Sequence, residues 1–229
     1  YYGQNGSSGP GALGFHTEAP NLPGFSGVTV TDRARAAGYP GAPMQENMSI
    51  GTNSGGGAAL GLTAAPYHRI NMLSCHADVG IGVVNRIYTL DFGGVAPHCG
   101  PADNQLVAYP FPEQTDVPIG THSQEVPNPM PDIAARQVGY PISLLGAPGT
   151  TVTLSSLTVT DSNGSSIPGR IVGTNTETGA PLGNYVFFMP LPGSSTGMYE
   201  WNTTYIVRAI GSFNGNPFAL TWRFTTASL

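Results

Sequence analysis

Three residues of the sequence carry side chains that could form one chemical site: His16, Glu46 and His68. Glu46 begins the segment Glu46–Gly51, His68 lies within Ala65–Arg69, and a Gly/Ala-rich passage joins the two segments. Imidazole and carboxylate groups are metal ligands and proton-transfer groups. Two imidazoles and one carboxylate could therefore converge on one pocket, and the sequence says less about what enters that pocket.

The elements that must position these residues are short. Helix caps, a proline and alternating apolar residues predict three helices followed by two strands. In chain order these elements cover residues 31–38, 58–64 and 66–73 for the helices and 78–84 and 87–92 for the strands. Thr31 is the expected N-cap of the first helix. Glycines at positions 80 and 82 indicate that a ligand or another backbone passes close to the first strand.

The second half of the chain has a different pattern. Its residues 100–141 are rich in proline, and short alternating segments separated by turn residues follow. The expected strands cover residues 151–160, 169–174, 185–189, 204–210 and 219–225. No helical period is present, so the pattern predicts a β-sandwich anchored by Trp201 and Trp222. We place the boundary near residue 107, which gives two domains, 1–107 and 108–229.

Composition limits the classes of function. Charged residues make up 9% of the chain, the eight basic residues are all arginine, and the net charge is -5. A protein without a basic patch is a poor partner for nucleic acid. No apolar run reaches the ~20 residues that a transmembrane helix needs. The lysine-free composition, rich in Asn, Thr, Gly and Pro, is typical of an exported protein and predicts a secreted, periplasmic or cell-surface location.

Cys75 and Cys99 flank the predicted strands. A disulfide between them would stabilise the fold by about 3 kcal/mol and would fit an oxidising compartment. The alternative is a pair of buried free thiols.

Several pieces of the first half, in this order, resemble the CAP superfamily (cysteine-rich secretory proteins, antigen 5, pathogenesis-related 1) in its bacterial SCP-like branch. The resemblance covers roughly residues 15–93. The pieces are Arg33, Ala36-Ala37-Gly38-Tyr39, Glu46-Asn47-Met48-Ser49-Ile50-Gly51, Ala65-Pro66-Tyr67-His68-Arg69-Ile70-Asn71-Met72-Leu73, Gly80-Ile81-Gly82-Val83 and Tyr88-Thr89-Leu90-Asp91-Phe92-Gly93.

The resemblance implies a three-layer α-β-α sandwich with a cleft that holds two histidines and two acidic residues. By position, His16, Glu46 and His68 match three of the four. The second acid is missing from the helix before His68, and Glu18 or Asp91 are candidates to replace it. The family also begins with a long helix, of which Tyr1–Asn5 looks like the end. We expect that helix and a signal sequence upstream, or a sheet face that is exposed or covered by a partner.

The second half resembles bacterial immunoglobulin-like modules of surface proteins. The predicted fold class is therefore α+β, a CAP-like α-β-α sandwich followed by an immunoglobulin-like β-sandwich.

The leading functional hypothesis is an exported binding or surface-interaction protein. On the family fold, His16, His68 and Glu46 would hold a divalent metal such as zinc in an open tetrahedral site, or the cleft would take a small apolar ligand. Lipid, sterol or a protein is the partner that the family implies, and the β-sandwich would be a spacer or adhesion module. For His68, the alternative is a structural pair with Glu46, and for Glu46 a capping role or an ion pair with Arg69.

A second hypothesis is a metal-dependent hydrolase of cell-wall material or peptide. The sequence has no Gly-x-Ser-x-Gly elbow and no His-Glu-x-x-His helix, which favours a binding role over an enzyme. In a third hypothesis the cleft is vestigial and the sandwich carries the function. His76, His98 and His122 are expected to be incidental.

Overall fold

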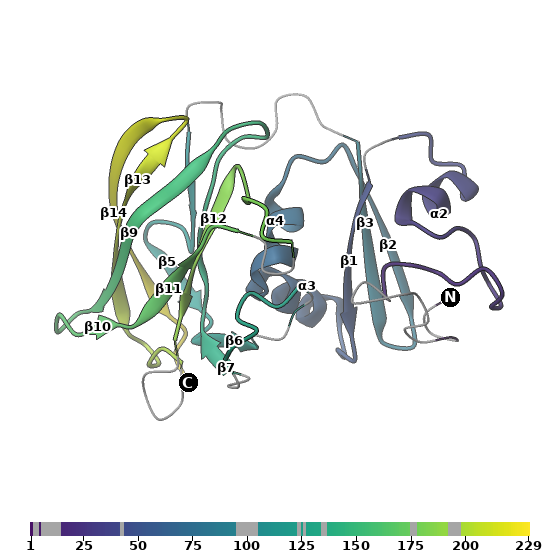
Figure 1. Ribbon diagram of the computed structural model, residues 1–229. Helices are drawn as coiled ribbons and strands as arrows, with labels where there is room; N and C mark the ends of the chain where they lie inside the picture. The colour runs from purple at the N-terminus through teal and green to yellow at the C-terminus, as the bar shows by residue number, and fades with distance from the viewer. Residues whose placement is uncertain are drawn as a thin grey trace. The chain divides into compact units, whose positions relative to one another are not determined.

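The computed structural model describes residues 1, 5, 15–41, 44–94, 105–122, 125, 127–133, 137–174, 178–191 and 198–229. Contacts within the chain divide it into two compact units. The first contains Tyr1–Thr63 and Asn71–Cys99, and the second contains Ala64–Ile70 and Gly100–Leu229. Their helices and strands are labelled in Figure 1. The short segment Ala64–Ile70, which includes His68, thus belongs to the second unit.

A three-stranded antiparallel sheet is the centre of the first unit, with strand order β1-β3-β2. Its strands are β1 (Met44–Ile50), β2 (Asp78–Val84) and β3 (Ile87–Gly93). In the register, Asp91 of the central strand stands opposite Glu46 on one side and Gly80 on the other. Directly opposed residues point to the same face of a sheet, so these three residues share one face.

Helix α2 (Val30–Ala36) lies beside this sheet (Figure 1). Its N-cap is Thr29, not the predicted Thr31. A capping box fixes this start: the Thr29 hydroxyl accepts from the Asp32 amide at 3.2 Å, and the Thr29 amide donates to the Asp32 carboxylate at 3.0 Å. Gly38 follows the helix with a φ of +86°, which a glycine adopts without steric cost. Because the cap fixes the start of the helix, it also fixes the direction in which the Arg33 side chain, one turn later, projects from the helix.

Two more helices follow β1. Helix α3 covers Gly55–Ala64, and helix α4 covers Pro66–Leu73. Pro66 begins α4 at the position where a missing amide hydrogen costs nothing. Among the helices that the structure describes, none combines the length and the apolar character needed to cross a bilayer.

The predicted fold class is wrong: the described chain is mostly β-strand in several small sheets and does not contain the predicted α-β-α sandwich. Helices α2, α3 and α4 have only 7, 10 and 8 residues. In a three-layer sandwich the sheet faces are buried under helices. Here the edge strand β2 leaves Val79, Ile81 and Val83 exposed by 55%, 67% and 53%. The described residues therefore leave that part of the sheet uncovered.

The second unit contains a five-stranded sheet of order β10-β9-β13-β14-β5, a four-stranded sheet of order β11-β12-β8-β4, and a β6-β7 pair. The strand bounds are β4 Val107–Tyr109, β5 Gln114–Val117, β6 Gly120–His122, β7 Gln137–Gly139, β8 Ile142–Leu145, β9 Val152–Asp161, β10 Ser166–Ile167, β11 Gly169–Val172, β12 Tyr185–Pro190, β13 Thr204–Phe213 and β14 Asn216–Thr226. Buried side chains of both larger sheets form one core.

Trp222 and Trp201 have different environments in this unit. Trp222 is buried in the core, and its indole nitrogen donates to the Pro110 carbonyl at 3.0 Å. Trp201 is 41% exposed. Of the two residues predicted as core and edge anchors, Trp222 is the core residue, and its indole N–H has a buried acceptor.

Candidate functional site

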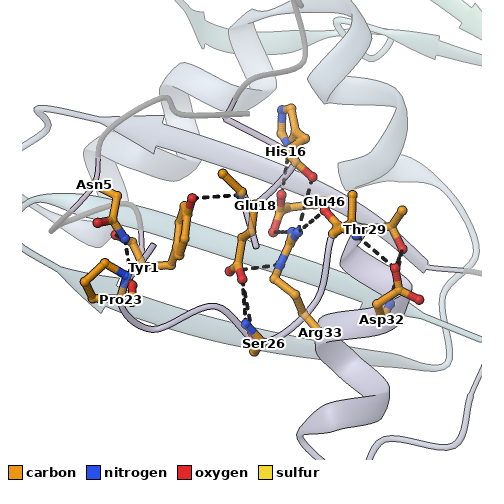
Figure 2. Close-up of polar contacts among 12 residues, drawn as sticks. Tyr1, Asn5, His16, Glu18, Pro23, Ser26, Thr29, Asp32, Arg33 and Glu46 are labelled. Atoms are coloured by element: carbon orange, nitrogen blue, oxygen red, sulfur yellow. Dashed lines mark hydrogen bonds and ion pairs between the residues drawn. The ribbon is translucent and has the colours of Figure 1, made fainter. Parts of the chain in front are cut away.

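Glu46 is the centre of a cluster of polar side chains in the first unit (Figure 2). Its Oε1 atom lies 2.8 Å from His16 Nδ1, and its Oε2 atom accepts from Arg33 Nη2 at 2.7 Å. The Glu46 side chain is only 3% exposed, whereas His16 is 23% exposed. The structure therefore brings two of the three predicted site residues, His16 and Glu46, together. Arg33 of helix α2 binds the same carboxylate.

Arg33 connects this carboxylate to the loop that carries His16. Its Nη1 atom donates to the carbonyls of His16 at 3.2 Å and Val28 at 3.3 Å, and its Nε atom lies 3.6 Å from Glu18 Oε1. Glu18, one of the two acids expected to complete the site, is buried and also accepts from the Ser26 amide at 2.8 Å. Glu18 and Glu46 therefore both neutralise and orient the Arg33 guanidinium, as Figure 2 shows.

The surroundings of Glu46 favour its ionised form. Burial alone would raise the pKa of this carboxyl, but the hydrogen bond with His16 and the charge and hydrogen bond of Arg33 outweigh the burial and lower the pKa. Glu46 is therefore an ion-paired strand residue. A capping role and an ion pair were the two predicted alternatives for Glu46. The structure has an ion pair, and its partner is Arg33.

Asp91 is the second acid beside Glu46, placed there by the β1–β3 register. Burial, then the negative charge of Glu46 and a hydrogen bond with it, raise the pKa of Asp91 to about 7. Two adjacent carboxyls in a desolvated site do not both ionise readily. Asp91 is thus a neutral acid below pH 7 next to an ionised Glu46. Its Oδ1 atom is buried and has no hydrogen-bond partner among the described residues.

A pocket of about 330 Å³ opens beside Asp91. Helix α2, the turn after it and the sheet supply its lining, which is mostly small or apolar: Ala34, Ala37, Tyr39, Met44, Asp78, Val79, Gly80, Asp91 and Gly93. The Tyr39 hydroxyl donates to Asp78 Oδ2 at 2.8 Å. Gly93 leaves room for the Tyr39 ring, since a Cβ atom at position 93 would lie 2.5 Å from the Tyr39 hydroxyl oxygen.

His68 lies in the second unit, where its partner carboxylate is Glu125. Its Nδ1 atom is 2.8 Å from Glu125 Oε2. The same carboxylate accepts from the backbone amides of Tyr67 and His68 in the first turn of α4. An anion at this place satisfies amides that have no partner within the helix. The predicted crevice shared by His16, Glu46 and His68 stays a prediction.

Arg69, the predicted ion-pair partner of Glu46, is fully buried in the second unit. Its guanidinium donates to the Pro141 carbonyl at 2.7 Å and the Ser143 hydroxyl at 3.2 Å. The rings of Tyr109 and Tyr140 lie on it at 4.7 Å and 4.8 Å. These contacts attach the first turn of α4 to the β-sheets of its unit, so Arg69 has a structural role there.

The remaining predicted residues are placed as follows. Cys75 is buried, and Cys99 lies outside the described residues, so their disulfide stays a prediction. The His76 ring contacts the Asn71 carbonyl at 3.0 Å. His122 is exposed at the end of β6, and His98 lies outside the described residues.

Zinc does not fit the described cluster around Glu46. A site for this metal needs three or four nitrogen, sulfur or oxygen ligands with lone pairs directed at the ion. Within the described ranges there is no group of three or more His, Cys, Asp and Glu side chains arranged in that way. The Arg33 guanidinium also donates to Oε2 of Glu46, which leaves that carboxylate fewer free lone pairs for a metal ion. A metal held jointly with His68 stays a prediction, as does hydrolysis that depends on it.

A scan of protein-family models and a search of curated proteins found no match for this chain. The resemblance to the CAP superfamily stays a prediction that depends on the short pieces of sequence given above.

Sequence reasoning named Asp91 only as a substitute acid, and it missed the two strongest partners, Arg33 for Glu46 and Glu125 for His68. Arg33 was part of the family resemblance, so a site role was open to it. Glu125 comes from the proline-rich stretch between the two halves, where no pattern marked it.

Proposed function

We propose that the first unit is a binding module for a small, mainly apolar ligand, which enters the pocket beside Asp91. The observation that carries the proposal is a cavity of about 330 Å³ with a mostly apolar lining that includes two acids, Asp78 and Asp91. Binding sites for small molecules are commonly 300–1,000 Å³, mostly apolar, with few polar groups that fix the ligand's orientation.

The Asp91 carboxyl is a group of the pocket that can accept a hydrogen bond from a ligand. The Oδ1 atom of Asp91 is buried without a hydrogen bond to any other described residue. A buried polar atom in this condition costs roughly 1–3 kcal/mol, and a donor on a bound molecule would recover that cost. The Glu46 cluster holds the carboxyl in place, because Glu46 is itself fixed by Arg33 and His16.

Gly80 provides a way to close the pocket without disturbing the fold. It lines the cavity, and a Cβ atom there would approach no atom closer than 4.0 Å. The absence of a side chain at position 80 is therefore not required by the packing of neighbouring residues. The sequence indicated that a ligand or another backbone passes close to this strand, and the proposal takes the ligand. Gly82 is a matched control: it lies on the same face of β2, has nothing within 4 Å of an added Cβ, and does not line the pocket.

The test is a titration of the full chain with 1-hexanol, followed through the backbone amide NMR shifts of β2 and β3. We expect saturable shifts in the wild type and in Gly82→Val, and a loss of binding in Gly80→Val. Equal binding by all three proteins would place the ligand elsewhere, and no saturable shift in the wild type would refute the proposal.

The proposal includes export and a spacer or adhesion role for residues 108–229. It is supported by a composition with 9% charged residues and no lysine.

A further inference from the structure

The pocket beside Asp91 has charges of only one sign in its lining. Asp78 and Asp91 are its two ionisable acids, and none of its lining residues is basic. Arg33 is the basic residue of the neighbouring cluster, but its guanidinium is held by Glu46 at 2.7 Å and lies 3.6 Å from Glu18. The Arg33 charge is thereby neutralised by acids that do not line the pocket.

The two acids differ in what they offer. Asp78 already accepts a hydrogen bond from the Tyr39 hydroxyl at 2.8 Å. Asp91 has a buried oxygen with no donor among the described residues. It also stands opposite Glu46 in the strand register, and the lining of the pocket holds two acids and no basic residue to compensate them. A molecule placed there with its own proton donors and a positive charge gains both a hydrogen bond and a favourable Coulomb interaction.

We propose that the ligand of this pocket is a small organic ammonium ion, a primary amine with a short apolar chain. The ammonium group donates to Asp91 Oδ1, and the chain lies along the apolar wall formed by Ala34, Ala37 and Met44. This inference rests on the proposed binding function and names the chemical class of its ligand.

Other head groups fit less well. A carboxylate would meet two acids and no base in the lining. An alcohol can donate one hydrogen bond to Asp91, but it carries no charge for the carboxyl pair to attract. A bare metal ion would need at least three directed ligands, and the described chain has no such group.

Three ligands with one chain and different head groups test the inference: hexylamine, 1-hexanol and hexanoate. Dissociation constants come from NMR shift titrations of the full chain at pH 8, where Asp91 is ionised and the amine is protonated. A charge-assisted hydrogen bond is worth roughly tenfold in affinity over a neutral one. We expect hexylamine to bind about tenfold more tightly than hexanol, and hexanoate not to bind.

The matched variants are Asp91→Asn and Asp116→Asn, the latter an exposed acid of the second unit that does not line the pocket. Asp91→Asn should remove the tenfold preference, so that hexylamine and hexanol bind this variant equally, while Asp116→Asn should keep the wild-type preference. If hexanol and hexylamine bind the wild type equally, or if the preference survives in Asp91→Asn, the ammonium inference is overturned and the binding pocket stands. If none of the three ligands binds, both fail.

Discussion

Removing the charge of Asp91 should stabilise the first unit above pH 7. The pKa of this carboxyl rises from an ordinary 3.8 to about 7 in the folded chain. Between pH 4 and pH 7 the unfolded chain has therefore lost the proton that the folded chain still holds. Folding stability falls as the pH rises through this window, and above pH 7 the whole penalty of ionising Asp91 is present.

The size of the penalty follows from the two pKa values. A pKa difference of about 3 corresponds to about 4 kcal/mol, and screening by water at this partly exposed residue reduces it to about 2 kcal/mol. Asp91→Asn keeps the shape of the side chain and removes the titration. At pH 8 the variant should exceed the wild type in stability by about 2 kcal/mol, equivalent to about 30-fold in an opening equilibrium. Near pH 4 the two proteins should agree.

The assay must report on the first unit alone. Both tryptophans, Trp201 and Trp222, lie in the second unit, so fluorescence would not report on it. Protection of the β1 and β3 amides against hydrogen exchange gives local opening free energies, compared at pH 4.5 and pH 8. Asp78→Asn is the control, since Asp78 is exposed on the same sheet. A wild-type pH slope retained in Asp91→Asn would refute the reasoning about the carboxyl pair.

Four other predictions, three from the structure and one from the sequence, can be tested on the same chain. Arg33→Met leaves the buried Glu46 without its cation and should lower the free energy of opening at the β1 and β3 amides by about 3–5 kcal/mol, which hydrogen exchange measures. Arg33→Lys should lose less of this protection. Arg69→Met leaves the Pro141 carbonyl and the Ser143 hydroxyl without this donor and should destabilise the second unit by about 1–3 kcal/mol, seen as a lower urea midpoint in tryptophan fluorescence; an unchanged midpoint would contradict its anchoring role. The predicted disulfide of Cys75 should appear as a gain of two hydrogens in the intact mass on reduction, with an unchanged mass as the opposing result. In calorimetric titrations with zinc, the wild type and Glu46→Ala should give the same heat. A binding heat that is present in the wild type and lost in Glu46→Ala would restore the metal hypothesis.

Local patterns in the sequence were enough to predict many elements. Alternation and turn residues predicted a strand at 204–210, which lies within β13, and the Asn214-Gly215 turn joins β13 to β14 with both φ values positive, 50° and 78°. Such a turn depends on two neighbouring residues. Helix α4 likewise begins and ends where Pro66 and the apolar spacing predicted. These signals are all short-range.

The layers of the first unit could not be predicted in the same way. The resemblance consists of short pieces, and each piece specifies a local segment. Whether helices cover a sheet depends on their length and on the residues between the pieces. Strand β2 reads as an apolar strand, yet Val79, Ile81 and Val83 are more than half exposed. Hydrophobic alternation shows which side chains share a face and does not show what covers them.

The site was partly predictable for a related reason. His16 and Glu46 were named from residue type, and their 2.8 Å contact agrees with a common site. The strand that carries Glu46 was not predicted, so its register with Asp91 was also missing. A pairing of this kind depends on which residues of two distant strands stand opposite one another, and a shift by one residue would turn Asp91 to the other face.

The carboxyl pair explains why ligand binding and protonation should be linked in this unit. Glu46 is ionised because His16 and Arg33 act on it, and its charge in turn favours the protonated form of Asp91. Arg33 and His16 also favour ionisation of Asp91, but burial and Glu46 outweigh them. On β2, Gly80 stands opposite Asp91, and Asp78, two residues before it, is the acid of that strand that also lines the pocket. A cation in the pocket would therefore supply the one charge that Asp91 lacks, and the acid would ionise as the cation binds.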